Sequence, residues 1–259
     1  MLRHPFHIVD SRPWPLSSAM GVFLLASGLA MALNNKDHLI YLLGLLIVLA
    51  TLLQWWRDVS RESTMQGKHT NKVEDGIRLG MLLFILSEVL FFFTFFWAFF
   101  HASLSVGSEL GGLWPPKGVD GINPLEVPLL NTTLLLSSGA TITWTHIAIM
   151  NTIWSETHCG FAATVVLGAT FTFIQGLEYM WCSFTITDSV LGRTFYIATG
   201  FHGLHVVIGT IFIAVRWLRH HCSHFSPRHH IGFEASAWYW HFVDVVWLLL
   251  FICIYWWGF

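Results

Sequence analysis

The feature that most constrains this chain is an unbroken apolar run at residues 79–100, in which Glu88 is the one charged residue. A helix rises about 1.5 Å per residue, so the run would cover roughly 33 Å, the thickness of a bilayer's hydrocarbon core. A carboxylate near the middle of such a span costs about 2.5–3.5 kcal/mol or more unless it is protonated, paired or hydrated. The run therefore predicts a membrane helix in which Glu88 has a function that requires a polar side chain at mid-depth.

Composition agrees with a membrane protein. Hydrophobic residues make up 54% of the chain and charged residues 11%, whereas soluble domains average about 25% charged residues. The net charge of −2 argues against a nucleic-acid partner. The four cysteines have no CxxC spacing, so neither a disulfide framework nor a zinc ribbon is predicted.

Apolar runs of spanning length recur along the chain and predict seven transmembrane helices in a single all-α domain, residues 1–259. The expected helices lie near residues 15–33, 38–56, 78–104, 129–150, 160–182, 193–218 and 233–257. The connector at 57–77 is the most charged. A closed β-barrel would need segments of about ten alternating residues, and the sequence has none.

The distribution of Lys and Arg predicts the orientation of these helices. With seven spans, the N-terminus shares its side of the membrane with the loops after the second, fourth and sixth spans. That side would carry Arg3, Arg12, Arg57, Arg61, Lys68, Lys72, Arg78, Arg216, Arg219 and Arg228, and the other side Lys36, Lys117 and Arg193. Ten of the 13 basic residues thus accompany the N-terminus, which the positive-inside rule places on the inner side.

Several polar residues fall inside the expected spans. Three pairs have i,i+3 spacing, which puts both members on one helix face: Gln175 with Glu178, His202 with His205, and His241 with Asp244. Glu234 shares the face of the last pair, whereas Glu88 and His146 are isolated on their helices. Such residues would serve a proton path, an ion path or a metal site, or would form interhelical hydrogen bonds of about 0.6–2 kcal/mol each.

The 15 histidines raise the question of a metal or haem site. No HExxH or CxxCH motif is present, so no metal site is predicted. The histidine-rich loop at 220–230 lies beside Arg216 and Arg219, and this mixture is typical of contacts with lipid head groups.

Segments along the whole chain resemble cytochrome c oxidase subunit III. The matching segments include His4-Pro-Phe-His7, Gln54-Trp-Trp-Arg-Asp-Val59, Phe84-Ile-Leu-Ser-Glu88, Leu113-Trp-Pro-Pro-Lys-Gly118, Ala198-Thr-Gly-Phe-His-Gly-Leu-His-Val206, Gly232-Phe-Glu234 and Ala237-Trp-Tyr-Trp-His-Phe-Val-Asp-Val-Val-Trp247. The resemblance implies two helices followed by five, around a V-shaped cleft filled with phospholipid. It also implies a multi-pass core subunit of the mitochondrial inner-membrane oxidase, which passes electrons from cytochrome c to oxygen and pumps protons.

In this family the haem and copper are carried by partner subunits, so the resemblance implies no catalytic residue and no redox cofactor in this chain. The implied partners are subunits I and II, accessory subunits and phospholipids, including anionic lipid. The N-terminus would face the matrix and the C-terminus the intermembrane space.

The resemblance also implies roles for individual residues. The lipid-binding positions are Arg57, Arg61, His69, Arg219 and His224. Glu88 matches a buried carboxylate close to subunit I and linked to proton uptake, and we expect it to be protonated at neutral pH because desolvation disfavours the charged form. Ile147 and Trp181 replace a His and a Glu that are usual in the family, so any role of those two groups is in doubt.

Two other function classes stay open at this point. A proton-coupled membrane transporter or channel could use Glu88, Glu178 and Asp244, although such proteins commonly show inverted repeats and broken helices, which this chain lacks. A haem or quinone enzyme could use the histidines, and a Soret band in the isolated chain would reveal haem.

Overall fold

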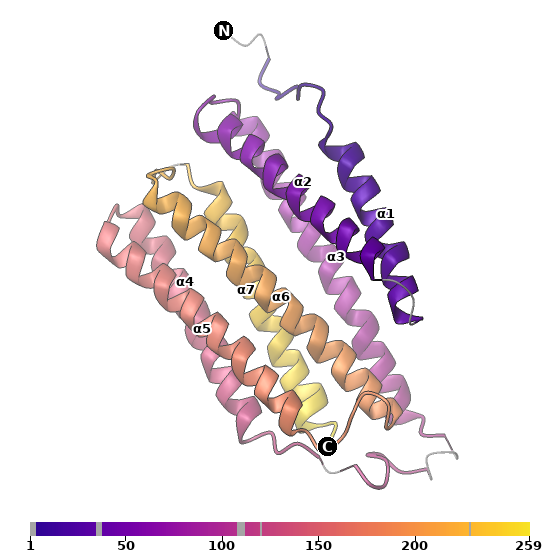
Figure 1. Cartoon of the computed structure of the whole chain (residues 1–259). Helices are drawn as coiled ribbons and strands as arrows, with labels where there is room; N and C mark the ends of the chain where they lie inside the picture. The colour runs from indigo at the N-terminus through magenta and orange to yellow at the C-terminus, as the bar shows by residue number, and fades with distance from the viewer. Residues whose placement is uncertain (1–3, 35–37, 108–111, 120, 228) are drawn as a thin grey trace. The chain divides into compact units, whose positions relative to one another are not determined.

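The structure, a computed structural model, describes residues 4–34, 38–107, 112–119, 121–227 and 229–259. Arg3, Lys36 and Arg228, three of the basic residues used to predict the orientation, lie outside the described residues. The described part contains seven α-helices and no β-strand (Figure 1). The helices are α1 (Trp14–Leu33), α2 (Leu39–Thr64), α3 (Asn71–Leu104), α4 (Val127–Met150), α5 (Trp154–Trp181), α6 (Val190–His221) and α7 (Ile231–Leu250), which continues as a π-helix (Phe251–Trp256).

The predicted all-α, seven-helix architecture is confirmed, but several helices are longer than their apolar runs. α2 continues to Thr64 and α3 begins at Asn71, so the expected connector 57–77 is helical except at residues 65–70. α5 begins at Trp154 rather than near residue 160. Hydropathy marks where lipid contact ends, whereas the backbone hydrogen bonds of a helix can continue into the polar interface.

Six helical segments in the described part of the chain are long and apolar enough to cross a membrane, and α4 is not among them. The Ser and Thr residues of α4 lower its hydropathy, but their hydroxyls bond to carbonyls of the same helix. Thr132, Ser138 and Thr145 donate to the carbonyls three or four residues earlier at 2.8, 2.6 and 2.7 Å. These polar groups therefore need no water, and α4 suits an apolar environment.

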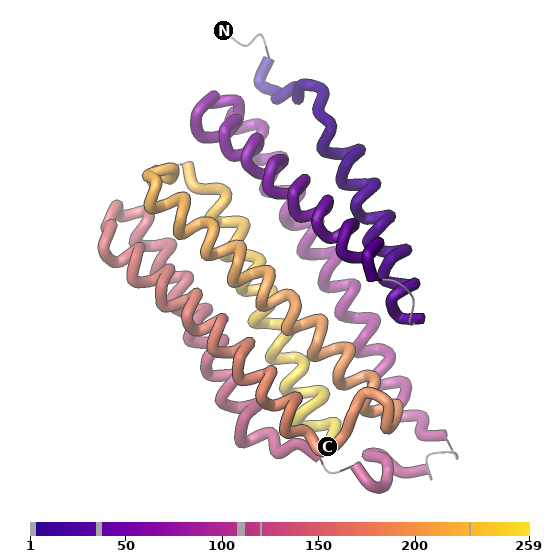
Figure 2. The backbone as a smooth tube through the Cα atoms, viewed as in Figure 1, coloured from indigo at the N-terminus to yellow at the C-terminus, as the bar shows by residue number. Residues whose placement is uncertain are grey.

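The chain divides into two compact units, Met1–Ile77 and Arg78–Phe259. In the first unit α1 and α2 lie side by side and in close contact (Figure 2). A Cβ atom at Gly28 would lie 2.3 Å from the backbone nitrogen of Tyr41, and one at Gly44 would lie 2.4 Å from that of Leu25. Glycine is therefore required at both positions for the two backbones to approach this closely.

The N-terminal segment of the first unit is fastened to the end of α2 by polar contacts. The guanidinium of Arg12 pairs with the buried carboxylate of Glu62, and the indole of Trp14 donates to Asp58 at 2.8 Å. His7 lies 3.8 Å from the same Glu62 carboxylate. Burial lowers the pKa of His7 below its ordinary value, and the positive charges of Lys68 and Arg12 lower it further.

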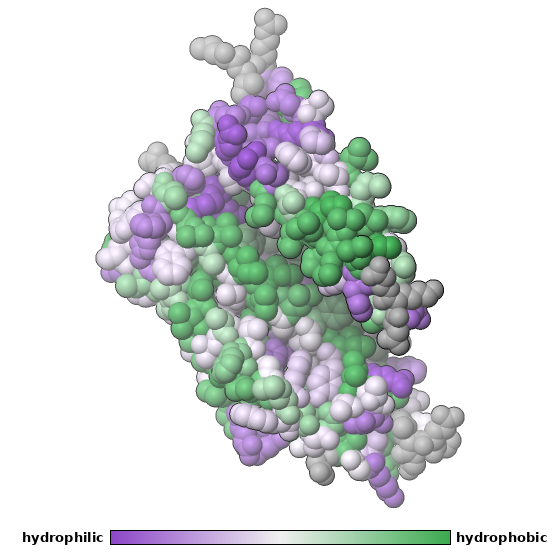
Figure 3. All heavy atoms as spheres, viewed as in Figure 1, coloured by the Kyte–Doolittle hydropathy of each residue, from purple (hydrophilic) through white to green (hydrophobic). Residues whose placement is uncertain are grey.

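In the second unit α7 is the most deeply buried helix and packs against α4 and α6. Trp240 and Trp247 are fully buried, and their indole N–H groups donate to Ser138 and Thr132 of α4 at 2.9 Å each. These bonds satisfy the polar end of each large aromatic side chain. On the visible face, hydrophobic residues gather along the middle of the helices and hydrophilic residues toward their ends (Figure 3), as expected of helices that cross a bilayer.

Candidate functional site

Glu88 of α3 forms a hydrogen bond with His205 of α6 that joins two spans. The Oε2 atom of Glu88 lies 2.9 Å from Nε2 of His205, and both side chains are largely buried, at 21% and 10% exposed. The other ring nitrogen of His205, Nδ1, lies 2.7 Å from the carbonyl oxygen of Phe201 in the preceding turn. Phe92 packs edge-on against the imidazole with ring centroids 5.0 Å apart.

These contacts restrict the protonation of the pair. A carbonyl oxygen only accepts hydrogen bonds, so Nδ1 of His205 must carry a proton. If the imidazole is neutral, its Nε2 is an acceptor and Glu88 must be the protonated donor; if it is an imidazolium, Glu88 is the ionised acceptor. In either state the Glu88–His205 bond holds one proton, and the two states differ only in which atom carries it.

None of the residues three or four positions from Glu88 on its own helix is polar. Its partner comes from α6, 117 positions further along the chain. His202 is fully buried and contacts the carbonyl of Val243 on α7 at 3.2 Å, so the two histidines serve different helix contacts.

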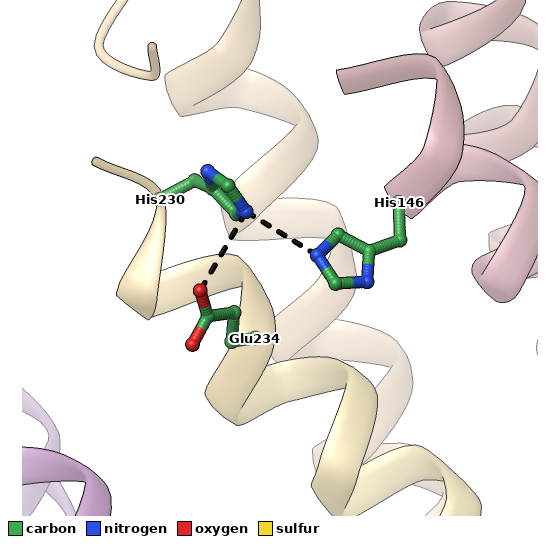
Figure 4. A group of neighbouring side chains, drawn as sticks. All are labelled: His146, His230 and Glu234. Carbon is green, nitrogen blue, oxygen red and sulfur yellow. Dashed lines mark hydrogen bonds and ion pairs between the residues drawn. The ribbon is translucent and has the colours of Figure 1, made fainter. Parts of the chain in front are cut away.

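A second polar cluster lies where α4 ends and α7 begins (Figure 4). Nε2 of His146 lies 3.2 Å from Nε2 of His230, which lies 3.6 Å from Oε1 of Glu234. Arg78 of α3 holds the same carboxylate, with Nε 3.1 Å from Oε2. His146 therefore has its partner outside its own helix.

Neither His230 nor Arg78 is among the candidate site residues predicted from the sequence. His230 was assigned to a loop, although its i,i+4 spacing to Glu234 could have shown that both side chains share one face at the start of a helix. No sequence signal connects Arg78 with this cluster.

The remaining predicted polar residues lie at several separate contacts. The side-chain amide of Gln175 on α5 donates to the carbonyl of Thr199 on α6 at 3.2 Å, and Glu178 is buried on α5 at 4% exposed. Nδ1 of His241 lies 3.9 Å from Oδ2 of Asp244 on the same helix. His241 also lies 3.4 Å from the hydroxyl of Thr143 on α4.

The residues expected to bind lipid are divided between the two units. Arg57 and Arg61 are exposed on the last turns of α2, and His69 lies 5.8 Å, ring to ring, from His7. In the second unit Arg219 lies over the ring of Phe225 at 5.1 Å, and the side chain of His224 is partly exposed. Each unit thus presents basic side chains near the end of a long apolar helix.

Comparisons with known proteins agree with this architecture. The family model for cytochrome c oxidase subunit III matches residues 4–259. Cytochrome c oxidase subunit 3 of Drosophila yakuba is 58% identical over 98% of this chain and 97% of its own length. Cytochrome c oxidase subunit 3 of Heterololigo bleekeri is 53% identical over 100% of both chains, and that of Pelomedusa subrufa is 54% identical over 98% of both.

The seven helices and their buried polar contacts define a polytopic α-helical membrane protein. The chain belongs to the cytochrome c oxidase subunit III family. It is accordingly a several-span subunit of mitochondrial cytochrome c oxidase, an oxidoreductase complex. This membership decides against the transporter and the independent haem enzyme considered from the sequence.

Proposed function

We propose that this chain is a core subunit without a redox centre, which stabilises the catalytic subunit of the oxidase and assists its proton uptake. The partners would be subunits I and II, which carry the haem and copper, together with accessory subunits of the inner mitochondrial membrane. The contacts of His205 support the absence of haem. Both of its ring nitrogens already contact protein groups, so neither is free to bind a haem iron.

The observation that carries the proton role is the 2.9 Å bond between Glu88 and His205. The pair keeps a proton within a span at the expected depth of Glu88, where an uncompensated carboxylate would be costly. We propose that this proton exchanges during uptake by the neighbouring catalytic subunit. The other interpretation is a fixed hydrogen bond that orients α3 against α6.

The Glu88→Gln variant of the assembled oxidase separates these interpretations. The glutamine amide can still donate to Nε2 of a neutral His205 but cannot titrate. We expect the variant complex to assemble with its usual haem content, but to pump fewer protons per electron or to lose activity sooner during turnover. The matched control is Glu126→Gln, which changes an exposed carboxylate before α4. Normal stoichiometry and lifetime in Glu88→Gln would leave only the packing role.

The absence of a redox centre has its own test. The purified subunit should contain no stoichiometric iron or copper and should show no Soret band. Haem retained by the separated chain in a one-to-one ratio would overturn this part of the proposal.

We also propose that the N-terminus and the loops at 65–70 and 222–230 face the matrix, with the C-terminus in the intermembrane space. The Lys and Arg distribution supports this orientation. In intact mitoplasts these two loops should resist added protease and become sensitive once the membrane is opened. Cleavage of either loop before opening would contradict the orientation.

A further inference from the structure

The cluster at the ends of α4 and α7 has the composition of a metal site. His146 lies one turn before α4 ends, His230 is the N-cap residue of α7, and Glu234 lies one turn into α7. Each residue presents one possible ligand atom, and the three atoms lie within 4.8 Å of one another. In Figure 4 the imidazole of His146 and the carboxylate of Glu234 both point toward His230.

Hydrogen bonding outside the cluster prepares His230 to act as a ligand. Its Nδ1 atom lies 3.0 Å from the carbonyl oxygen of Ser226, so Nδ1 carries the proton. In the neutral ring the lone pair of Nε2 is then directed at His146 and Glu234. A bond from the second ring nitrogen to a carbonyl is the usual way in which proteins fix the tautomer of a metal-binding histidine.

The distances between the ligand atoms fit a small divalent cation. Zinc binds imidazole nitrogen at about 2.0–2.1 Å, and at tetrahedral angles this puts two ligand nitrogens about 3.3 Å apart. The two Nε2 atoms are 3.2 Å apart, and Nε2 of His230 is 3.6 Å from the nearest carboxylate oxygen. An ion among the three atoms would therefore need only small side-chain movements.

The contacts of Glu234 with Arg78 leave its Oε1 atom able to bind an ion. Nε of Arg78 contacts Oε2 of Glu234 at 3.1 Å, and the contact of Nη2 with Oε1 is longer, at 3.4 Å. A carboxylate has about four acceptor positions, so Oε1 can bind an ion while Oε2 stays with the guanidinium. The Glu234 side chain is 17% exposed, and the cluster lies at helix ends, so an ion could enter from the aqueous side.

We propose that His146, His230 and Glu234 form a binding site for Zn²⁺ or a similar divalent transition metal, which links α4 to α7. Three protein ligands leave a fourth position for water. The site is separate from the Glu88–His205 pair and requires no change of oxidation state. Its effect would be to strengthen the contact between two helix ends that already meet where His146 contacts His230 and Phe233.

The test uses the intact, purified oxidase, treated with a chelator and then titrated with Zn²⁺. Anomalous diffraction at the zinc edge should show a peak between His146, His230 and Glu234 in the wild-type complex. The His146→Gln and Glu234→Gln variants should each hold one zinc fewer per complex, or bind it at least about tenfold more weakly. The control is His221→Gln, an exposed histidine near the same end of α6, which should retain zinc.

Three results would overturn the proposal. The first is a wild-type map without a peak among the three side chains, a measurement that needs no variant. The second is equal zinc content and affinity in the wild type and both Gln variants. The third is saturation at zinc concentrations that also fill exposed histidines such as His221, which would indicate an adventitious ion only.

Discussion

Glu88 of α3 and His205 of α6 hold one proton between them, because Nδ1 of His205 is committed to the carbonyl of Phe201. The proton can move along the 2.9 Å bond without a change in the net charge of the pair, although the charge on each of the two helices changes. A buried pair that stays neutral overall avoids the cost of an isolated charge in lipid. This property distinguishes the pair from a lone buried carboxylate.

Infrared spectroscopy of the complex tests the shared proton. Near neutral pH, bands of the protonated Glu88 carboxyl should decrease when imidazolium bands of His205 increase, because one proton serves both groups. In Glu88→Gln the imidazolium bands should disappear, since the amide supplies the donor and the ring stays neutral. An ionised Glu88 beside a neutral His205 at pH 7 would contradict the predicted sharing.

The close approach of α1 and α2 predicts a strong effect of a single methyl group. Gly44→Ala would place a Cβ atom 2.4 Å from the backbone nitrogen of Leu25, so the helices must move apart. We expect a loss of about 1–3 kcal/mol, as for other overpacked positions, seen as a lower melting temperature of the complex or loss of the first unit on mild proteolysis. Gly176→Ala, where no atom lies within 4 Å of the added group, should be neutral or stabilising.

The lowered pKa of His7 predicts that acid weakens the attachment of the N-terminal segment. Burial and the charges of Lys68 and Arg12 favour the neutral ring in the folded state. The contribution of His7 to stability is therefore complete above its unfolded pKa of about 6.5. It is lost as the pH falls through that value toward the lower folded pKa.

Limited proteolysis of the segment preceding α1 between pH 7.5 and pH 5 measures this effect. Cleavage should increase as the pH falls, and His7→Gln should remove most of the pH dependence. The same pH dependence in the variant would assign the effect to another group.

The basic residues near the helix ends predict retention of anionic lipid. A Lys or Arg near an anionic surface contributes about 1 kcal/mol, or roughly fivefold in affinity. Native mass spectrometry should therefore find fewer anionic phospholipids on the complex with Arg61→Ala and Arg219→Ala together. Lys117→Ala, on the opposite side in the proposed orientation, should leave the lipid count unchanged. Equal lipid counts in the wild-type complex, the double arginine variant and Lys117→Ala would argue against the two arginines as lipid ligands.

The number and order of the helices could be predicted from sequence because lipid solvation leaves long apolar runs. Helix ends could not, since charged turns such as residues 57–64 stay helical beyond the apolar run. Such differences arise because a helix ends where its backbone hydrogen bonds stop, which need not be where its hydropathy falls.

The candidate site was predicted only in part. Glu88, His146 and Glu234 were found because polar side chains in apolar runs are conspicuous. Their partners His205 and His230 lie 117 and 84 positions away, respectively, from Glu88 and His146. Single-helix periodicity contains no information about such distant pairs, so only the packing of α3, α4, α6 and α7 reveals them.

The internal hydrogen bonds of α4 have a consequence for topology. Because the hydroxyls of Thr132, Ser138 and Thr145 donate to carbonyls of their own helix, a segment of lower hydropathy can still cross the bilayer. With α4 the described part of the chain has seven crossings, an odd number, and without α4 it has six, an even number. With α4 included, seven crossings would put the two ends of the chain on opposite faces of the membrane; without it, every loop after α4 would be assigned to the opposite compartment.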